Sequence, residues 1–303
     1  MGKAMSDRVR RWINRVKWEI EKGQVAFDNY ARKFARADRN DDYPEFTIGI
    51  VTYLVRFEMF KTVLKRVRKA FPHTRIVVAV NGYYNPDRQR EYLAQIETYL
   101  KGFADVSMVA HEEPQALCRL WNELILASHT DKIFILNDDI DVAPHFGAAF
   151  GASGILGKDM AIINNSWSHF LISKRTILKV GWFDERLFGV GGEDWDYEAR
   201  LAFAGIELEN VALKGILNLS IYTTEFSFGK DVERVEKKYT KTSAVFLSKK
   251  WHVCNPQDPQ ARYVRIWGDY VCLHEGFETP VFYDFALLKT KEKDAGSDPM
   301  PKM

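Results

Sequence analysis

The sequence contains few cysteines, and it has no long apolar run. Its three cysteines, Cys118, Cys254 and Cys272, are far apart and form no CxxC pair. This spacing is typical of free thiols in a reducing cytoplasm rather than of a disulfide framework or a zinc site. No stretch reaches the roughly 18 consecutive apolar residues that a membrane-spanning helix requires, and no apolar segment of a signal peptide follows the basic N-terminus. We therefore expect a cytoplasmic protein with three free thiols.

Two nucleotide-binding fingerprints are also absent, and so is a large net charge. The chain has neither the GxGxxG run of dinucleotide-binding folds nor a Walker A run. Its 43 basic and 41 acidic residues leave a formal net charge of +2, which neither favours nor excludes nucleic acid. Apolar residues, by contrast, are plentiful, because 46% of the 303 residues are hydrophobic. This composition predicts a folded chain of one large or two small domains.

Strand-like and helix-like segments alternate from residue 46 onward. Apolar, β-branched segments predict strands at 46–53, 75–82, 105–111 and 131–136. Segments with helical periodicity lie between them, at 57–70, 86–101 and 114–128. Such alternation is typical of βαβ units, so we expect an α/β fold with a mostly parallel central sheet flanked by helices. Ligands bind beyond the carboxyl ends of the strands in such sheets, which is where Asn81 and the residues after the fourth strand lie.

The fourth strand ends in a dense acidic group. The stretch FILNDDIDVAP, residues 134–144, places three carboxylates in four positions after an apolar run. Crowded carboxylates repel one another and resist desolvation, and a cation would relieve both problems. Along an extended chain Asp139 and Asp141 would point the same way, with Asp138 facing the other way. The pair would then suit Mg²⁺ or Mn²⁺ carried in with a diphosphate; the alternative is a solvated acidic turn.

A second informative segment is VGWFDERLFGVGGEDWDYEARLAFAG, residues 180–205. The glycines within 189–192 predict a loop that lets the backbone approach a ligand or move. Glu193 and Asp194 then open a helix. Acidic residues in a first helical turn are favoured by roughly 0.3–1 kcal/mol each. Ordinary helix-start chemistry is therefore the alternative to a functional carboxylate pair.

Residues 6–37 predict an amphipathic helix. Val9, Ile13, Val16 and Ile20 recur at helical spacing, and the opposite face is basic. Two interpretations stay open. The helix could rest on an anionic membrane surface, which would make the protein peripheral to the inner face of the membrane. It could instead pack on the body of the protein or on a second subunit.

These motifs together resemble the GT-A glycosyltransferases, most closely the family-2-like members. The resemblance extends over about residues 46–252 and is carried by the stretches TIGIVTY, VVAVNG, CRLWNELILAS, the Asp-X-Asp group at 139–141 and GWFDERLFGVGGEDWDYEARLAFAG. It implies a Rossmann-like GT-A fold. It also implies metal-dependent transfer of a sugar from a nucleoside-diphosphate sugar to a hydroxyl of a saccharide or glycoconjugate, with inversion. No nucleic-acid partner is expected.

The resemblance implies roles for the carboxylates. Asp139 and Asp141 would hold Mn²⁺ or Mg²⁺, which bridges the donor diphosphate and stabilises the leaving group. His252, in the stretch KKWHVCN, would complete the metal site. Asp194 would be the general base that takes the proton of the acceptor hydroxyl. Glu193 would orient the acceptor, and it is the second choice for the base.

The resemblance also implies contacts with the donor. The residues that would make them are Thr52, Asn81, Asn122, Asp138 and Asp139. Asn81 stands where many relatives have an aspartate that binds the base of the nucleotide. This departure leaves the nucleotide open, with UDP as the default and GDP or dTDP as the alternatives.

The chain divides into three expected parts. Residues 1–43 would form the basic amphipathic helix, 44–255 the GT-A catalytic domain, and 256–303 a C-terminal extension with a polar tail. Two other functions stay open. One is a nucleotide-sugar-binding or scaffold module without turnover. The other is a phosphatase of the haloacid-dehalogenase type, although that motif normally follows the first strand of its fold, and here three strands precede it.

Overall fold

The computed structural model describes residues 45–187, 191–219, 242–254, 263–266 and 269–273, together with six isolated positions between 16 and 27. The predicted N-terminal helix lies outside the described residues except at those six positions, which are helical and exposed. The polar tail lies outside them entirely. Within the described part of the chain, no helix combines the length and the hydrophobicity needed to cross a bilayer.

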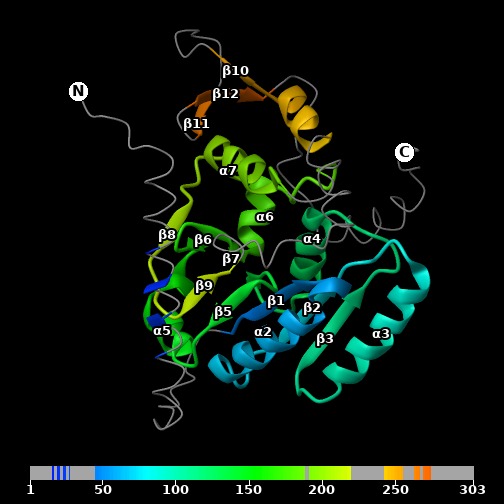
Figure 1. Ribbon diagram of the computed structural model, residues 1–303. Helices are drawn as coiled ribbons and strands as arrows, with labels where there is room; N and C mark the ends of the chain where they lie inside the picture. Colours follow the sequence, from blue (N-terminus) through cyan, green and yellow to red (C-terminus); the bar gives the residue numbers. More distant parts are fainter. Residues whose placement is uncertain are drawn as a thin grey trace.

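A seven-stranded sheet forms the centre of the protein (Figure 1). Its strands in spatial order are β3 (Val106–Ala110), β2 (Ile76–Val80), β1 (Thr47–Thr52), β4 (Lys132–Leu136), β7 (Ser166–Ser173), β6 (Met160–Ile163) and β8 (Glu209–Val211). Neighbours from β3 to β4 are parallel, whereas β7 runs antiparallel to both β4 and β6. The mostly parallel sheet predicted from the sequence is confirmed. The four predicted strands match β1–β4 to within one or two residues at each end.

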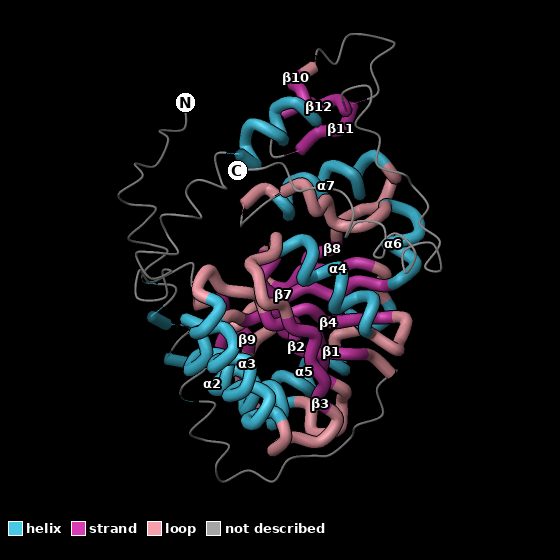
Figure 2. Tube along the Cα trace, turned by 90° about the vertical axis from the view of Figure 1, so that its right-hand side faces the viewer, coloured by secondary structure: helices cyan, strands magenta, loops and turns pink. Residues whose placement is uncertain are grey.

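Helices cover both faces of this sheet (Figure 2). One face packs against α2 (Phe57–Ala70), α3 (Pro86–Leu100) and α5 (Phe146–Ala152). The other packs against α4 (Leu117–Ala127), α6 (Lys174–Val180) and α7 (Glu193–Phe203). Successive side chains of a strand point to opposite faces of the sheet, so the apolar core consists of two clusters, one on each face. Ile48 and Ile50 contribute to the first apolar cluster, and Val51 contributes to the second.

The order of the strands reverses at β1. Along the chain, β1 is followed by β2 and then β3 on one side, whereas β4 pairs in parallel with the other side of β1. The carboxyl ends of β1 and β4 therefore meet at one edge, since Ile50 lies opposite Leu136. Two connections begin at this edge, the 3-10 helix η1 (Leu54–Arg56) and the bend after β4. Such a switch point is where open α/β sheets bind ligands.

Two smaller sheets complete the described structure. Strand β5 (Ile140–Val142) pairs antiparallel with β9 (Ile216–Asn218). Strands β10 (Trp251–Val253), β12 (Asp269–Leu273) and β11 (Tyr263–Ile266) form a three-stranded antiparallel sheet beside α7 (Figure 1). Residues 242–250, just before β10, are helical. The three-stranded sheet joins β10 to two strands on the far side of the expected domain boundary at residue 255.

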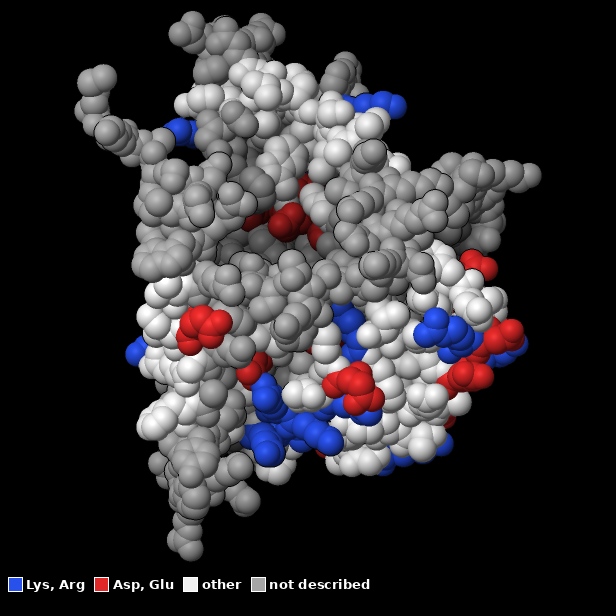
Figure 3. Space-filling model, in the orientation of Figure 1, with Lys and Arg blue, Asp and Glu red and all other residues white. Residues whose placement is uncertain are grey.

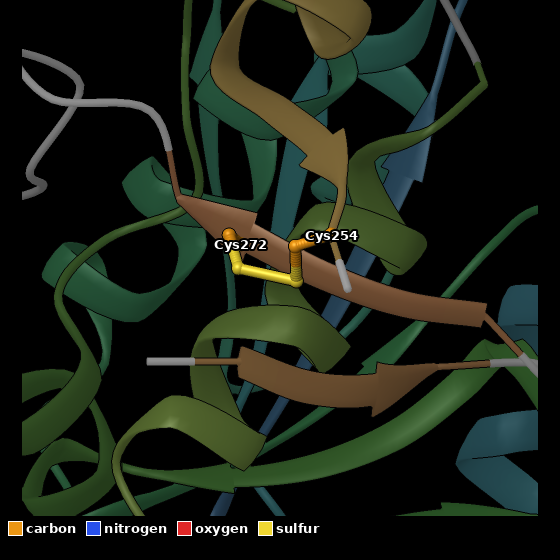
Figure 4. The surroundings of a disulfide bond; sticks show 2 residues. All are labelled: Cys254 and Cys272. Carbon is orange, nitrogen blue, oxygen red and sulfur yellow. A yellow bond between two sulfur atoms is a disulfide. The ribbon is translucent and has the colours of Figure 1, made fainter. Parts of the chain in front are cut away.

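The expectation of three free thiols is wrong. Cys254, which follows β10, and Cys272 in β12 form a disulfide with Cα atoms 5.9 Å apart (Figure 4). Cys118, on α4, is the one free cysteine, and it is buried. The two partners are 18 residues apart in the sequence. Only the antiparallel pairing of β10 with β12 brings them together, so their spacing carried no signal of a bond. A reducing cytoplasm no longer follows from the cysteines.

The disulfide makes a direct prediction about thiol content. Protein purified without reductant and then denatured should expose one reactive thiol per chain, from Cys118, and three after reduction. Titration with a chromogenic disulfide reagent measures both values. The Cys118→Ser variant is the matched control, and it should give no thiol before reduction and two afterwards. Three thiols in the unreduced wild type would show that the bond does not form.

Candidate active site

Arg56 lies between two carboxylates at the switch point. Its Nη1 donates to Asp138 Oδ1 at 2.9 Å and lies 3.1 Å from Asp139 Oδ2. All three residues are nearly buried, with 8% of Arg56, 2% of Asp138 and 4% of Asp139 exposed. Buried like charges repel each other strongly, and a shared guanidinium offsets part of that repulsion. Part of the cationic charge that the acidic group requires is therefore supplied by the chain itself.

The acidic group does not follow the expected alternation of a strand. β4 ends at Leu136, β5 begins at Ile140, and the chain bends at Asp138 and Asp139. Side chains alternate between faces only along extended backbone. At the bend, both carboxylates turn to the same arginine. The expectation that Asp138 faces away from Asp139 is wrong.

Asp141 has a different partner. It lies in β5 between the buried residues Ile140 and Val142, and its carboxylate forms an ion pair with Arg66 of α2. The expected metal pair of Asp139 and Asp141 is thus divided between two arginines. The structure brings Asp139 together with Asp138 instead.

Two buried carboxylate oxygens beside Arg56, Asp138 Oδ2 and Asp139 Oδ1, make no hydrogen bond of normal geometry within the described residues. The hydroxyl of Thr52 lies close to both Asp138 and Tyr92 and interacts with both. Burial raises the pKa of Asp138 to about 6, an effect that Arg56 opposes and Asp139 reinforces. Buried polar atoms are rarely left without a partner, because desolvation without compensation is costly. These oxygens therefore mark a place where a ligand would find acceptors and hydroxyl donors.

Asn81, after β2, has an internal role. Its Oδ1 accepts from the backbone N–H of Gly82 at 2.8 Å and of Gln115 at 2.7 Å, and its Nδ2 donates to Gln115 O at 3.1 Å. A Cβ at Gly82 would collide with the backbone of Glu113, so the loop after β2 and the loop after β3 lie in close contact. An aspartate could not donate to Gln115 O, which explains physically why an amide stands here. The expected contact of Asn81 with the nucleotide remains a prediction.

Asn122, on α4, connects two parts of the candidate site. Its Nδ2 donates to Phe183 O at 3.0 Å and to Glu185 Oε1 at 2.8 Å, while its Oδ1 accepts from Phe183 N at 3.0 Å. The residue is 3% exposed. Asn122 thus fixes the segment before the glycine-rich loop against α4, and a contact with the donor remains a prediction.

Glu193 and Asp194 open α7, as the sequence predicts. Glu193 is buried, and its Oε2 accepts from the backbone N–H of Gly191 at 2.6 Å. Burial raises the pKa of Glu193 to about 7; hydrogen bonds from its own N–H and from Gly191 oppose this rise, and the charge of Asp194 adds to it. Asp194 is half-buried, and its Oδ1 accepts from Trp195 N at 2.8 Å. Figure 3 shows a recess near the centre of the face that it draws, with acidic side chains at its bottom.

Sequence reasoning missed a buried ionic network behind this pair. Lys250 Nζ lies 2.7 Å from Asp184 Oδ2 and 2.6 Å from Asp196 Oδ1. Asp196 also accepts from Arg200 Nε at 2.9 Å and from Trp251 Nε1 at 2.8 Å. Helix-start chemistry accounts for Asp196 from the sequence alone, and nothing in the sequence near Lys250 signals that its side chain is buried.

His252 does not join the acidic group after β4. It is exposed on β10, within the three-stranded sheet, and both Figures 1 and 2 place that sheet far from the strands that carry the acidic group. No cluster of three or more His, Cys, Asp or Glu side chains suited to a metal occurs among the residues that the structure describes. The expected set of Asp139, Asp141 and His252 is therefore not assembled.

The buried carboxyl of Glu193 predicts a pH-dependent stability. Its pKa is raised in the folded state from an ordinary value of 4.5, so folding favours the neutral form. Its stabilising contribution is complete below pH 4.5 and is lost as the pH rises to about 7. Relative to the Glu193→Gln variant, the wild type should lose up to about 3 kcal/mol across this window.

Denaturant unfolding at several pH values between 4 and 8 measures this difference. The exposed Glu207 provides a matched control, because Glu207→Gln should leave the pH dependence unchanged. A stability difference between wild type and Glu193→Gln that stays constant with pH would contradict the raised pKa.

Comparisons with known proteins give one family match and several distant structural matches. Residues 111–246 match the family described as glycosyltransferase like family 2, which is just under half of the chain. No curated protein matches. Among solved structures, two chains of TarS from S. aureus align at 12% identity over 68% of this chain, with TM-scores of 0.45 and 0.43.

This chain spans 43% of the longer TarS chain and 71% of the chain titled TarS 1-349. At this distance neither the activity nor the residues of TarS carry over. The matched segment starts at the end of β3 and includes the acidic group after β4, Asn122 and the first turn of α7. Residues 111–246 are thus similar to the family-2-like glycosyltransferases, and the structure itself shows a mostly parallel sheet between helices.

Proposed function

We propose that this protein moves a sugar from a nucleoside-diphosphate sugar to a hydroxyl of a saccharide or glycoconjugate, with inversion and with the help of a divalent cation. UDP is the favoured nucleotide, with GDP and dTDP as alternatives. The observation that carries the proposal is the buried pair of Asp138 and Asp139 on Arg56, at the switch point of the sheet. The glycosyltransferase family supplies the class of reaction.

The residues present fit a hard divalent cation, although not through the set predicted from the sequence. Asp138 Oδ2 and Asp139 Oδ1 are buried oxygens without a hydrogen-bond partner in the described structure. Mg²⁺ and Mn²⁺ usually take one or two protein carboxylates, with phosphate oxygens supplying further ligands. Asp139 would be the principal ligand and Asp138 its neighbour, while Asp141 stays paired with Arg66. When bound, the cation would act as a Lewis acid on the leaving diphosphate.

The chain's own groups prepare this end of the site. Arg56 holds the two carboxylates in one orientation, so that they need not reorganise when the donor arrives. Thr52 and Tyr92 place buried hydroxyls near Asp138, where they can contact polar groups of the donor. Burial keeps water away from the reacting bond and strengthens each electrostatic contact.

The acceptor would be activated at the start of α7. Asp194 is the proposed general base, because it is half-buried rather than enclosed and so can meet an acceptor hydroxyl. Glu193 is buried and already accepts from Gly191, which suits a role in holding the glycine-rich loop and orienting the acceptor. Removal of the acceptor proton opposite the leaving group would give one displacement and therefore inversion of the anomeric centre.

The first functional prediction separates the two candidate metal ligands. Asp139→Asn should weaken Mn²⁺-dependent binding of UDP, GDP or dTDP, whichever binds best, by roughly 100-fold or more, since a ligand matters at least as much as its outer-shell support. Asp141→Asn should change that affinity less than about threefold, because its carboxylate is engaged by Arg66. Titration calorimetry with and without Mn²⁺ measures both. Equal losses of affinity in the two variants would show that Asp139 and Asp141 bind the metal together. No loss in either variant would show that the metal does not bind at this site.

The second functional prediction tests the base. Asp194→Asn should lower kcat for transfer by about 10²–10⁴, because an amide cannot take the acceptor's proton. Donor affinity should stay nearly unchanged, since Asp194 lies on a different segment from Asp138 and Asp139. Transfer rates and donor Kd in wild type, Asp194→Asn and Glu193→Gln are the measurements. If only the Glu193 variant loses transfer, Glu193 is the base. If wild type binds the donor without transferring it, the chain is a binding module.

A further inference from the structure

Lys250 is an ammonium group enclosed entirely within the protein. It is 0% exposed, and its Nζ bridges Asp184 Oδ2 at 2.7 Å and Asp196 Oδ1 at 2.6 Å. Asp184 also binds Arg186 through both of its carboxylate oxygens. Asp196 lies in the first turn of α7 and Asp184 in the segment before the glycine-rich loop. One charge thus joins the end of the 242–250 helix to two neighbouring segments, at Asp184 and at Asp196, that lie far earlier in the sequence.

A buried ion pair of this kind is better suited to setting geometry than to adding stability. Desolvation of the charges offsets much of their mutual attraction, and apolar residues of similar volume often stabilise a core as well. Hydrogen bonds between charged groups, however, depend on direction, so they favour one arrangement of the segments that carry these groups. Asp196 is held from three directions, by Lys250, Arg200 and Trp251 Nε1.

The helix that carries Lys250, residues 242–250, also contacts the glycine-rich turn before α7. Gly192 is the N-cap of α7 with a φ of 95°, and a Cβ there would collide with Leu247 Cδ1. Leu247 and Lys250 both belong to the 242–250 helix. This helix therefore contacts the start of α7 at two points, Gly192 just before Glu193 and Asp196 just after Asp194. The two candidate carboxylates lie between these contacts.

We propose that Lys250 is a positioning residue for acceptor activation: it fixes the first turn of α7, and with it Glu193 and Asp194, against the segment that contains Asp184. The expected effect on the transfer rate rests on the proposed function. The expected ordering of the first turn of α7 does not. Lys250 is fully buried and so does not touch the substrate. It acts by holding the carboxylates, where a displacement of about 1 Å can cost on the order of 100-fold in rate.

Two measurements on the full-length chain test this. Lys250→Met removes the charge and keeps most of the side-chain volume, while Lys249→Met is the matched control at an exposed neighbour. Hydrogen exchange of the amides of residues 191–197 should be at least about tenfold faster in Lys250→Met, with β1 and β4 unaffected and with no change in Lys249→Met. This measurement needs no substrate, so it stands even if the proposed function fails.

Kinetics test the catalytic consequence. In Lys250→Met, kcat for transfer should fall by roughly 10–100-fold while the donor Kd stays within about twofold. A loss of kcat and donor affinity together would overturn the positioning role, because a general loosening of the fold would produce it. Wild-type transfer and unchanged exchange in Lys250→Met would overturn it as well.

A milder variant keeps the test decisive if Lys250→Met does not fold. Leu247→Ala removes the contact at Gly192 without leaving a charge unpaired. It should accelerate exchange at 191–197 and lower kcat with an unchanged donor Kd, although less than loss of the charge would. Exchange and kcat equal to those of wild type in Leu247→Ala would overturn the inference that the 242–250 helix positions these carboxylates.

Discussion

The parallel pairing of β1 with β4 is the constraint on which the candidate site depends. It brings the ends of two strands that are more than 80 residues apart to one edge, so that Arg56 after β1 meets Asp138 and Asp139 after β4. Neither carboxylate would be tolerable at such burial without a counter-charge. The guanidinium neutralises them only in part, because each carboxylate keeps one oxygen without a partner in the described structure. The fold therefore buries two carboxylates beside one guanidinium, which is the arrangement on which the proposed donor site rests.

A second buried ionic centre, around Lys250, lies behind the start of α7. The two centres use charge differently. Arg56 contacts the carboxylates that would meet the donor, whereas Lys250 contacts Asp184 and Asp196, which support the segment that would meet the acceptor. Asn122 links α4 to that supporting segment through the backbone of Phe183. The groups proposed for the donor and for the acceptor thus lie on separate elements, so one set can be altered by mutation without direct change to the other.

Much of the fold could be predicted from the sequence because its signals are local. Helix α2 was predicted at its observed bounds, since Phe60, Val63, Leu64 and Val67 recur at helical spacing with basic residues opposite. The position of the acidic group at a carboxyl edge followed from the alternation of strands and helices alone. The start of α7 at Glu193 followed from the glycines and from acidic first-turn residues.

What escaped prediction depends on contacts between distant segments. The bend at Asp138 and Asp139, which replaces strand alternation, arises from how β4 leads into β5. Arg66 and Lys250 are ordinary basic residues in the sequence, and only the packing of α2 on β5 and of the 242–250 helix on α7 turns them toward carboxylates. The disulfide likewise requires the β10–β12 pairing.

Tertiary contacts also determine which of the three aspartates keep an oxygen that a ligand could bind. The sequence offers three aspartates in four positions, and spacing alone cannot rank them. Arg66 engages Asp141 at the edge of α2, and Arg56 engages one oxygen each of Asp138 and Asp139. The oxygens left over are buried, and the hydroxyl of Thr52 lies close to Asp138. Since preorganised polar groups need not reorganise when charge develops, Arg56 and Arg66 would determine which part of the acidic stretch can serve the proposed donor.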